Sequence, residues 1–248
     1  MTLKFNERVH RYWLDGKPVP GVTTLLGNGL PKPALPRWAA KSVAEYVADN
    51  LHDLDAWGRM GREQLVAALK QKPWTDRDHA AVRGTEVHDL AECVIHGEEV
   101  EVPERLHGYV EGLARLLDTH SVEPIVTEVP VASRAKWYAG KPDAIVRMHG
   151  ETWLLDWKTS KGVYGETALQ TAAYAKAEFY APTPDDEQPL PHIDRIGVVH
   201  VTDGESTLYP LGDIDEAYRA FLDVARVASH ADWIKGLVGD PYEPEKVA

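Results

Sequence analysis

The clearest pattern of apolar and polar positions lies at residues 142–161, PDAIVRMHGETWLLDWKTSK. Two apolar runs, DAIVRM and ETWLLD, flank His149–Gly150, and such a dipeptide is typical of a two-residue β-hairpin loop. If these residues form the loop, Met148 faces Glu151. Counting outward from that pair puts Asp143 directly opposite Asp156.

The second strand of this hairpin has two different faces. Side chains alternate between the faces of a strand, so Trp153, Leu155 and Trp157 share one face. Leu154, Asp156 and Lys158 share the other. The large aromatic face predicts core packing. The opposite face brings an acid and a base together on a strand that otherwise looks buried.

The rest of the pattern predicts a mixed α/β (α+β) protein. We expect a hairpin at 9–19, a short helix from Thr23, a proline-rich break at 28–36 and a helix at 37–50. A long helix capped by Thr75 should run to Gly97, and another should span 105–119. After these helices we expect a meander of three strands, at 122–133, 137–148 and 151–160. It should be followed by a helix (165–180), a polar loop (182–191), a strand (193–202) and a helix (213–228).

This order predicts a central mixed sheet flanked by helices, within residues 76–248. Residues 1–75 should form an N-terminal hairpin and a mostly helical cap.

The facing carboxylates of Asp143 and Asp156 predict a cation. Like charges directly opposite each other destabilise a strand pair. Lys158 could neutralise one of them, which would leave a plain ion-pair network with Lys141. A divalent ion would neutralise both, and an oxygen-rich site with few protein ligands suits Mg²⁺ or Mn²⁺. We therefore favour one or two such ions here.

Composition narrows the class of protein. The chain has 248 residues, of which 44% are hydrophobic and 27% charged, as in ordinary soluble globular proteins. No apolar run is long enough to span a membrane and the N-terminus lacks a signal-peptide core, so we expect a cytoplasmic protein without a membrane partner. The single cysteine, Cys93, excludes an internal disulfide and any four-thiolate cluster held by one chain.

The net charge of −12 argues against an all-basic surface, but basic side chains gather locally. They occupy 31–41 (Lys32, Arg37, Lys41) and 131–147 (Arg134, Lys136, Lys141, Arg147). These stretches predict either solvated surface or a basic groove on an acidic body. Trp137 and Tyr138, within the second stretch, are candidates for stacking on nucleic-acid bases.

Four motifs occur in a specific order: RGTEVH (83–88), GKPDAI (140–145), LLDWKTSK (154–161) and QTAAY (170–174). In this order they resemble the PD-(D/E)xK nuclease superfamily, specifically its RecB-like branch, which includes phage exonucleases and CRISPR-associated relatives. The opening HRYWLDGKPVPGVTTLL is similar to the start of phage-encoded members. The resemblance implies a restriction-endonuclease-like core and, with one cysteine only, a member without an iron–sulfur cluster.

The resemblance also implies roles for single residues. His88, Asp143 and Asp156 fall on metal-binding positions, together with the backbone carbonyl of Trp157. Lys158 falls on the catalytic lysine, where it could orient or deprotonate water or offset phosphate charge. Gln170 and Tyr174 fall on an accessory motif, and their spacing of four puts them on one helix face. Glu128 and Glu92 are further candidates for the metal site or its surroundings, and the sequence leaves both open.

The predicted function is a metal-dependent DNA exonuclease, used in phage DNA replication or recombination with a possible partner protein from those processes, in the host bacterial cytoplasm. Three alternatives stay open: a structure-specific endonuclease, a non-catalytic module that binds DNA ends, and a nuclease that acts on RNA. No Walker loop and no zinc spacing of histidines occurs in the sequence, so ATPase and deaminase activities are not indicated.

Overall fold

The computed structural model describes residues 2–241, apart from the side chains at positions 76, 79, 80 and 232. Its strands are β1 (Leu3–Asn6), β2 (Arg11–Leu14), β3 (Lys17–Val19), β4 (Glu123–Thr127), β5 (Val131–Ser133), β6 (Tyr138–Gly140), β7 (Ala144–Met148), β8 (Glu151–Lys158), β9 (Phe179–Thr183), β10 (Asp186–Pro189), β11 (Arg195–Thr202) and β12 (Glu205–Pro210). Its α-helices are α1 (Val22–Gly29), α2 (Ala34–Asp49), α3 (Leu54–Gly58), α4 (Arg62–Ile95), α5 (His107–Thr119), α6 (Glu166–Ala175) and α7 (Ile214–Lys235), with short 3₁₀ helices at Glu7–Val9, Leu51–Asp53 and Glu104–Leu106.

The central sheet is mixed and has five strands in the order β12-β11-β8-β7-β4. β8 and β11 are parallel, and the other neighbours are antiparallel. Met148 pairs with Glu151 and Ala144 with Leu155, so the predicted hairpin register is confirmed. His149 and Gly150 both have positive φ, 52° and 80°, as a two-residue loop of this kind requires. The expected mixed α/β fold is therefore observed.

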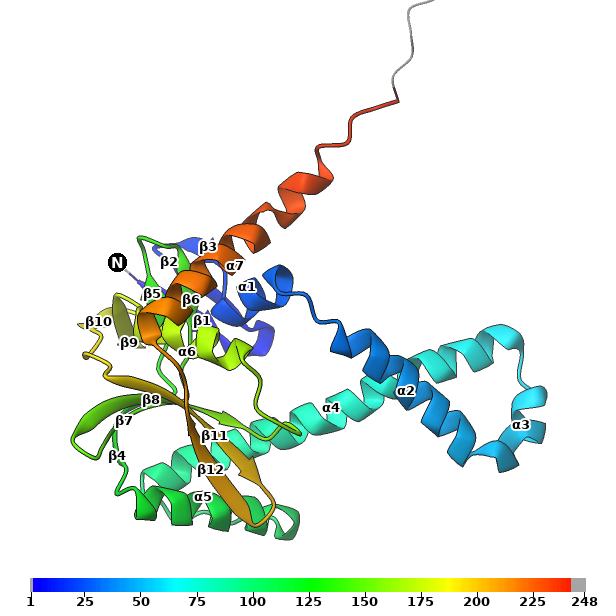
Figure 1. The fold of residues 1–248 in the computed structure, drawn as a ribbon, viewed down its shortest axis with the longest axis horizontal. Helices are drawn as coiled ribbons and strands as arrows, with labels where there is room; N and C mark the ends of the chain where they lie inside the picture. Colours follow the sequence, from blue (N-terminus) through cyan, green and yellow to red (C-terminus); the bar gives the residue numbers. More distant parts are fainter. Residues whose placement is uncertain (1, 242–248) are drawn as a thin grey trace, which may run out of the picture.

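Helices cover both faces of the central sheet (Figure 1). On one face, α4 and α5 pack on Trp153, Leu155 and Trp157 of β8, as the alternation predicts. On the other face, Leu154 packs with α6, and α1 and α7 form the layer outside it. Because both faces of β8 are covered, any charged side chain on its inner positions is buried.

The expected meander of three strands is wrong, because two sheets share these residues. The stretch 122–133 contains β4 and β5, and the stretch 137–148 contains β6 and β7. In each pair one strand belongs to the central sheet and the other to a second sheet of order β10-β9-β5-β6. Pro130 and Pro142 lie at the two breaks, where a residue without an N–H group ends a ladder.

The expected helix start at Thr75 is also wrong. α4 begins at Arg62, runs through Pro73 and Thr75, and ends at Ile95. Residues 62–71, REQLVAALKQ, are mostly strong helix formers, and α4 packs against α2, so the helix continues across the proline. The boundary proposed at residue 75 therefore falls inside one helix.

Three smaller differences concern the C-terminal part. The helix expected at 165–180 ends at Ala175, and residues 182–191, expected as a loop, contribute to the β9–β10 hairpin. β12 was not expected, although Asp203–Gly204 before it is a typical hairpin loop.

No helix among the described residues has both the length and the apolar character needed to cross a membrane.

Candidate functional site

Asp143 and Asp156 meet at the end of the β7–β8 hairpin. Asp143 is the residue before β7, one position beyond the last hydrogen-bonded pair, Ala144 with Leu155. Its Oδ2 accepts a hydrogen bond of 2.6 Å from the backbone N–H of Trp157. This bond fixes the Asp143 carboxylate next to Asp156 and leaves its other oxygen toward α4.

Asp156 is buried, with 1% of its surface exposed. Its Oδ1 accepts a hydrogen bond of 2.8 Å from the Gln170 side-chain amide. Its Oδ2 lies 2.6 Å from the ammonium nitrogen of Lys158, so the acid and base predicted on one face of the strand form an ion pair. Among the described residues, this oxygen has no hydrogen-bond partner besides that ion pair.

α4 brings His88 to the same place. Its Nδ1 lies 3.5 Å from Asp143 Oδ1. Val87, Leu90 and Ala91 on the same helix are buried in the core beneath the sheet. Gly84, one turn earlier, faces Thr159, because a Cβ added there would lie 3.4 Å from the Thr159 hydroxyl. The motif RGTEVH therefore places α4 beside the end of β8.

Glu128 joins this group, which the sequence left open. Its backbone N–H donates to the carbonyl of Asp143 over 3.1 Å, and its φ of 51° turns the chain out of β4. Ligand atoms of His88, Glu128 and Asp143 all lie within 4.8 Å of one another. Glu128 also pairs with Lys141 at 2.6 Å, so the lysine of GKPDAI holds this carboxylate in the site. Glu92 is not a member of the group among the described residues.

The local charges change the pKa values of these groups. Burial and the nearby charge of Asp143 raise the pKa of Asp156 to about 6. Burial also raises the pKa of Glu128, against the opposing effect of Lys141. Burial alone would lower the pKa of His88 and of Lys158, but the carboxylates of Asp143 and Asp156 outweigh it, and both pKa values are raised.

These residues fit a hard divalent cation. The group offers carboxylate oxygens from Asp143 and Glu128 and an imidazole from His88. Asp156 adds a buried oxygen beside them that accepts no hydrogen bond from a described residue. Carboxylates are the ligands that Mg²⁺ and Mn²⁺ prefer, and imidazole is compatible with Mn²⁺. A cation here would lower the free energy of the mutually repelling carboxylates.

α6 supplies Gln170 and Tyr174, which share one face of that helix. The Gln170 amide contacts both Asp156 and, at 3.4 Å, the Tyr174 hydroxyl. The Tyr174 ring lies directly against Gly140, where an added Cβ would overlap it. The glycine of GKPDAI is thus explained by the tyrosine of QTAAY: no larger residue leaves room for that ring.

Of the two alternatives left open for 131–147, solvated surface or a basic groove, the structure gives the groove no support at Arg134 and Lys141, while Lys136 and Arg147 are exposed. Arg134 is held by Asp15 and Glu187, and Lys141 by Glu128. Tyr138, a stacking candidate, is buried, and its hydroxyl donates to the carbonyl of Ala173. Arg134 links the β2–β3 turn to β10 of the second sheet, and of the stacking pair Trp137 is the partly exposed member.

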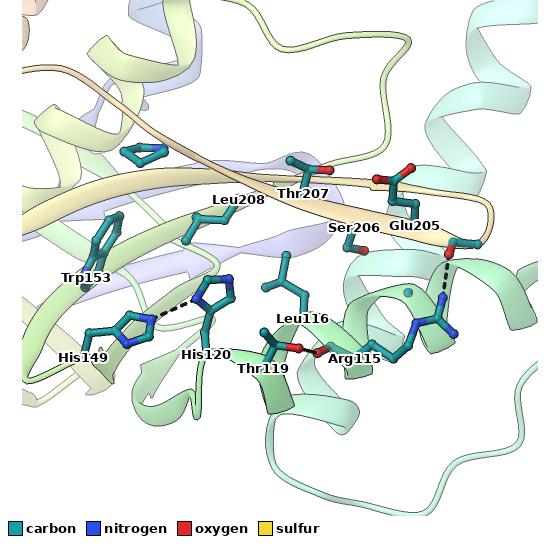
Figure 2. A pocket seen from close by; sticks show the side chains of 13 residues that line it. Arg115, Leu116, Thr119, His120, His149, Trp153, Glu205, Ser206, Thr207 and Leu208 are labelled. Carbon is teal, nitrogen blue, oxygen red and sulfur yellow. Dashed lines mark hydrogen bonds between the residues drawn. The ribbon is translucent and has the colours of Figure 1, made fainter.

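A separate cavity lies on the other face of the sheet. Figure 2 shows it between α5 and the β11–β12 hairpin, beside Trp153 of β8. His120 and His149 point toward each other there, with ring nitrogens 2.9 Å apart. Trp153 is on the opposite face of β8 from Asp156, so this cavity is not part of the carboxylate site.

Comparisons with known proteins add little to this picture. Neither a scan against family models nor a search of curated proteins finds a match. The chain is similar to the solved structure SSO0001, with 16% identity over 62% of this chain and 88% of that one, and a TM-score of 0.27. So loose a likeness gives no information on function.

Replacing Gly140 should disturb the site through Tyr174. In Gly140→Ala the new methyl group must displace the ring, and we expect a loss of about 1–3 kcal/mol in the free energy of unfolding, measured with urea. Gly162→Ala is the control, because an added Cβ there meets nothing within 4 Å. Equal stability of the two variants would contradict the proposed contact. In a double-mutant cycle, Gly140→Ala and Tyr174→Ala should be strongly non-additive.

Divalent cation binding should release protons near pH 6. The pKa values of Asp156 and His88 are both raised, so the metal-free protein holds protons that a cation must displace. Calorimetric titration with Mn²⁺ in two buffers of different ionisation enthalpy should show this release, fading as pH rises toward about 8. The apparent affinity should fall by up to about tenfold per pH unit below the pKa for each proton displaced. Glu92→Gln should behave as wild type. Heats independent of the buffer near pH 6 would count against this site.

Proposed function

We propose that this protein is a metal-dependent nuclease that hydrolyses phosphodiester bonds in DNA, acting as an exonuclease. One observation carries the proposal: residues of all four motifs meet around the buried Asp156. The first two motifs are far apart in the sequence, with 52 positions from His88 to Gly140. His88, Asp143, Lys158 and Gln170 each contact another member of this group directly.

The cation would be held by His88, Asp143 and Glu128, with Asp156 beside them. When bound, Mg²⁺ or Mn²⁺ supplies a water of lowered pKa and positive charge against the phosphate. In the hydrolysis, the oxygen of a water molecule bonds to phosphorus and the water gives up one proton, one ester P–O bond breaks, and the leaving oxygen takes up one proton, so no net proton is needed. The protein positions the phosphate and stabilises the negative charge that gathers on it.

Lys158 is suited to the charge-stabilising role. Its ammonium lies 2.6 Å from a carboxylate, and its pKa is raised, so it is a cation at neutral pH. A cation donates hydrogen bonds to phosphate or water and cannot accept a proton from water. This supports Lys158 as a donor that orients water or offsets phosphate charge, in place of a general base.

Gln170 and Tyr174 are suited to positioning. The Gln170 amide holds Asp156 Oδ1, which leaves Asp156 Oδ2 for the cation or Lys158. The buried Tyr174 hydroxyl has a pKa raised well above its ordinary value by that burial, so it stays a neutral hydrogen-bonding group. We therefore place both residues as supports of the reacting groups.

Digestion of end-labelled linear single-stranded and double-stranded DNA and of closed circles tests the proposal. Each should be run with Mg²⁺, with Mn²⁺ and with EDTA, beside Asp156→Asn. We expect metal-dependent loss of linear DNA only, absent in the variant, because Asn cannot bind the cation as a carboxylate does. Cutting of closed circles would assign an endonuclease. Intact DNA in every reaction would favour the alternative of a non-catalytic module that binds DNA. Parallel reactions on RNA strands of the same sequence test whether the enzyme cleaves DNA or RNA.

Lys158→Ala should separate cleavage from binding. Loss of a cation aimed at the phosphate typically lowers the rate by about 10²- to 10³-fold. DNA binding, measured by fluorescence anisotropy in EDTA, should change by much less. Lys136→Ala removes an exposed lysine outside the site and is the matched control. A parallel loss of cleavage and binding would instead make Lys158 an anchor for the phosphate.

A further inference from the structure

A cavity of about 820 Å³ lies between α2 and α4. Figure 1 shows α2 crossing the part of α4 that projects from the body of the molecule, with the chain before α6 reaching α4 near the crossing. The lining comprises Leu35, Pro36, Trp38, Ala39, Ser42 and Glu45 of α2, Trp74, Arg77 and Arg83 of α4, and Lys161. We call it the α2–α4 groove.

The walls of the groove are apolar and aromatic. Trp74 is 48% exposed and Leu35 is 53% exposed. No residue of α2 is buried, although the helix has 16 residues. A projecting helix that shows its apolar side chains to solvent marks an interaction surface rather than a structural core.

The groove also carries cations without acidic partners. Neither Arg83 nor Lys161 forms an ion pair or hydrogen bond with a described residue, and Arg83 Nε is buried without a partner. Arg77 lies over the Trp74 ring at 4.7 Å and also contacts Asp78. The one acid of the lining, Glu45, is paired with Lys41. In a chain of net charge −12, this favours a negatively charged occupant.

The inner end of the groove adjoins the carboxylate site. Arg83 is five residues before His88 on the same helix, a rise of about 7.5 Å. Lys161 is three residues after Lys158, and Thr159 between them faces Gly84 of α4, where an added Cβ would lie 3.4 Å from its hydroxyl. A chain bound along the groove would therefore pass directly from Arg83 and Lys161 to the site.

We propose that the α2–α4 groove binds a single-stranded segment of nucleic acid and leads it to the carboxylate site. Trp38 and Trp74 stack on unpaired bases, while Arg77, Arg83 and Lys161 contact phosphates. Only unpaired bases present free faces to tryptophan, so the groove discriminates against duplex. The choice of occupant rests on the proposed nuclease function, because it explains why a polyanion should reach the metal site.

Binding of labelled oligothymidylate to the full-length protein, in EDTA so that nothing is cleaved, tests the proposal. Trp38→Ala and Trp74→Ala should each weaken binding about fivefold or more. Trp233→Ala removes a tryptophan of α7 that is 61% exposed and should have no effect. Arg83→Ala with Lys161→Ala should lower the slope of log affinity against log salt by about 1.4, since each phosphate contact on a single strand contributes about 0.7.

Two further measurements keep the proposal open to refutation. A duplex hairpin of the same length should compete poorly against the labelled strand, and equal competition would overturn it. Trp74→Phe keeps an aromatic face and should retain most of the affinity, which shows that weak binding by Trp74→Ala is not a folding defect. Wild-type affinity of the variant Trp38→Ala with Trp74→Ala for the labelled strand would overturn the proposal. So would the finding that the wild type self-associates and that this variant loses self-association while it binds the strand unchanged.

The outcome is separable from that of the nuclease proposal. The small diester bis(p-nitrophenyl) phosphate cannot span the groove, so the tryptophan variants should hydrolyse it as wild type does. A wild type that binds the strand through the groove and cleaves nothing would refute the nuclease and support the groove. A wild type that cleaves, with variants that bind and cleave equally well, would refute only the groove.

Discussion

The two-residue loop at His149–Gly150 is the constraint on which the site depends. Both residues have positive φ, and this loop fixes the β7–β8 register. A shift by one residue would turn every side chain of β8 to the other face of the sheet. Asp156 and Lys158 would then enter the α4–α5 core, and the tryptophans would enter the site. A local turn therefore decides which groups can do chemistry.

Placing Asp156 in this position costs stability, and several neighbours offset the cost. A buried carboxylate beside another carboxylate is destabilising, as its raised pKa shows. Lys158, the Gln170 amide and the backbone N–H of Trp157 compensate part of that energy. Residues in such an arrangement fold less favourably than apolar residues of similar volume would. This cost is understandable if the carboxylates serve a ligand that supplies the remaining positive charge.

The sequence predicts the local parts of this site better than the distant parts. The hairpin register and the two faces of β8 follow from alternation and one loop, and both are confirmed. The exchange of strands between two sheets depends on long-range pairing, so β5 and β6 could not be assigned to a second sheet from pattern alone. Glu128 joins the group through the left-handed turn after β4, and nothing in its neighbouring residues predicts that backbone conformation. Prolines lie at the breaks at 130 and 142, but Pro73 lies inside α4, so a proline alone does not predict the end of an element.

The distribution of ion pairs explains how an acidic chain could still bind a polyanion. Cations within the body of the fold, such as Arg134 and Lys141, are matched to carboxylates and hold sheets together. The unmatched Arg83 and Lys161 line the α2–α4 groove, five residues before His88 and three residues after Lys158. Attraction over distances beyond about 10 Å is screened at moderate salt, so net charge matters less than these neighbours. A phosphate approaching the site would meet this local positive charge, and a bound cation would extend it across Asp143 and Asp156.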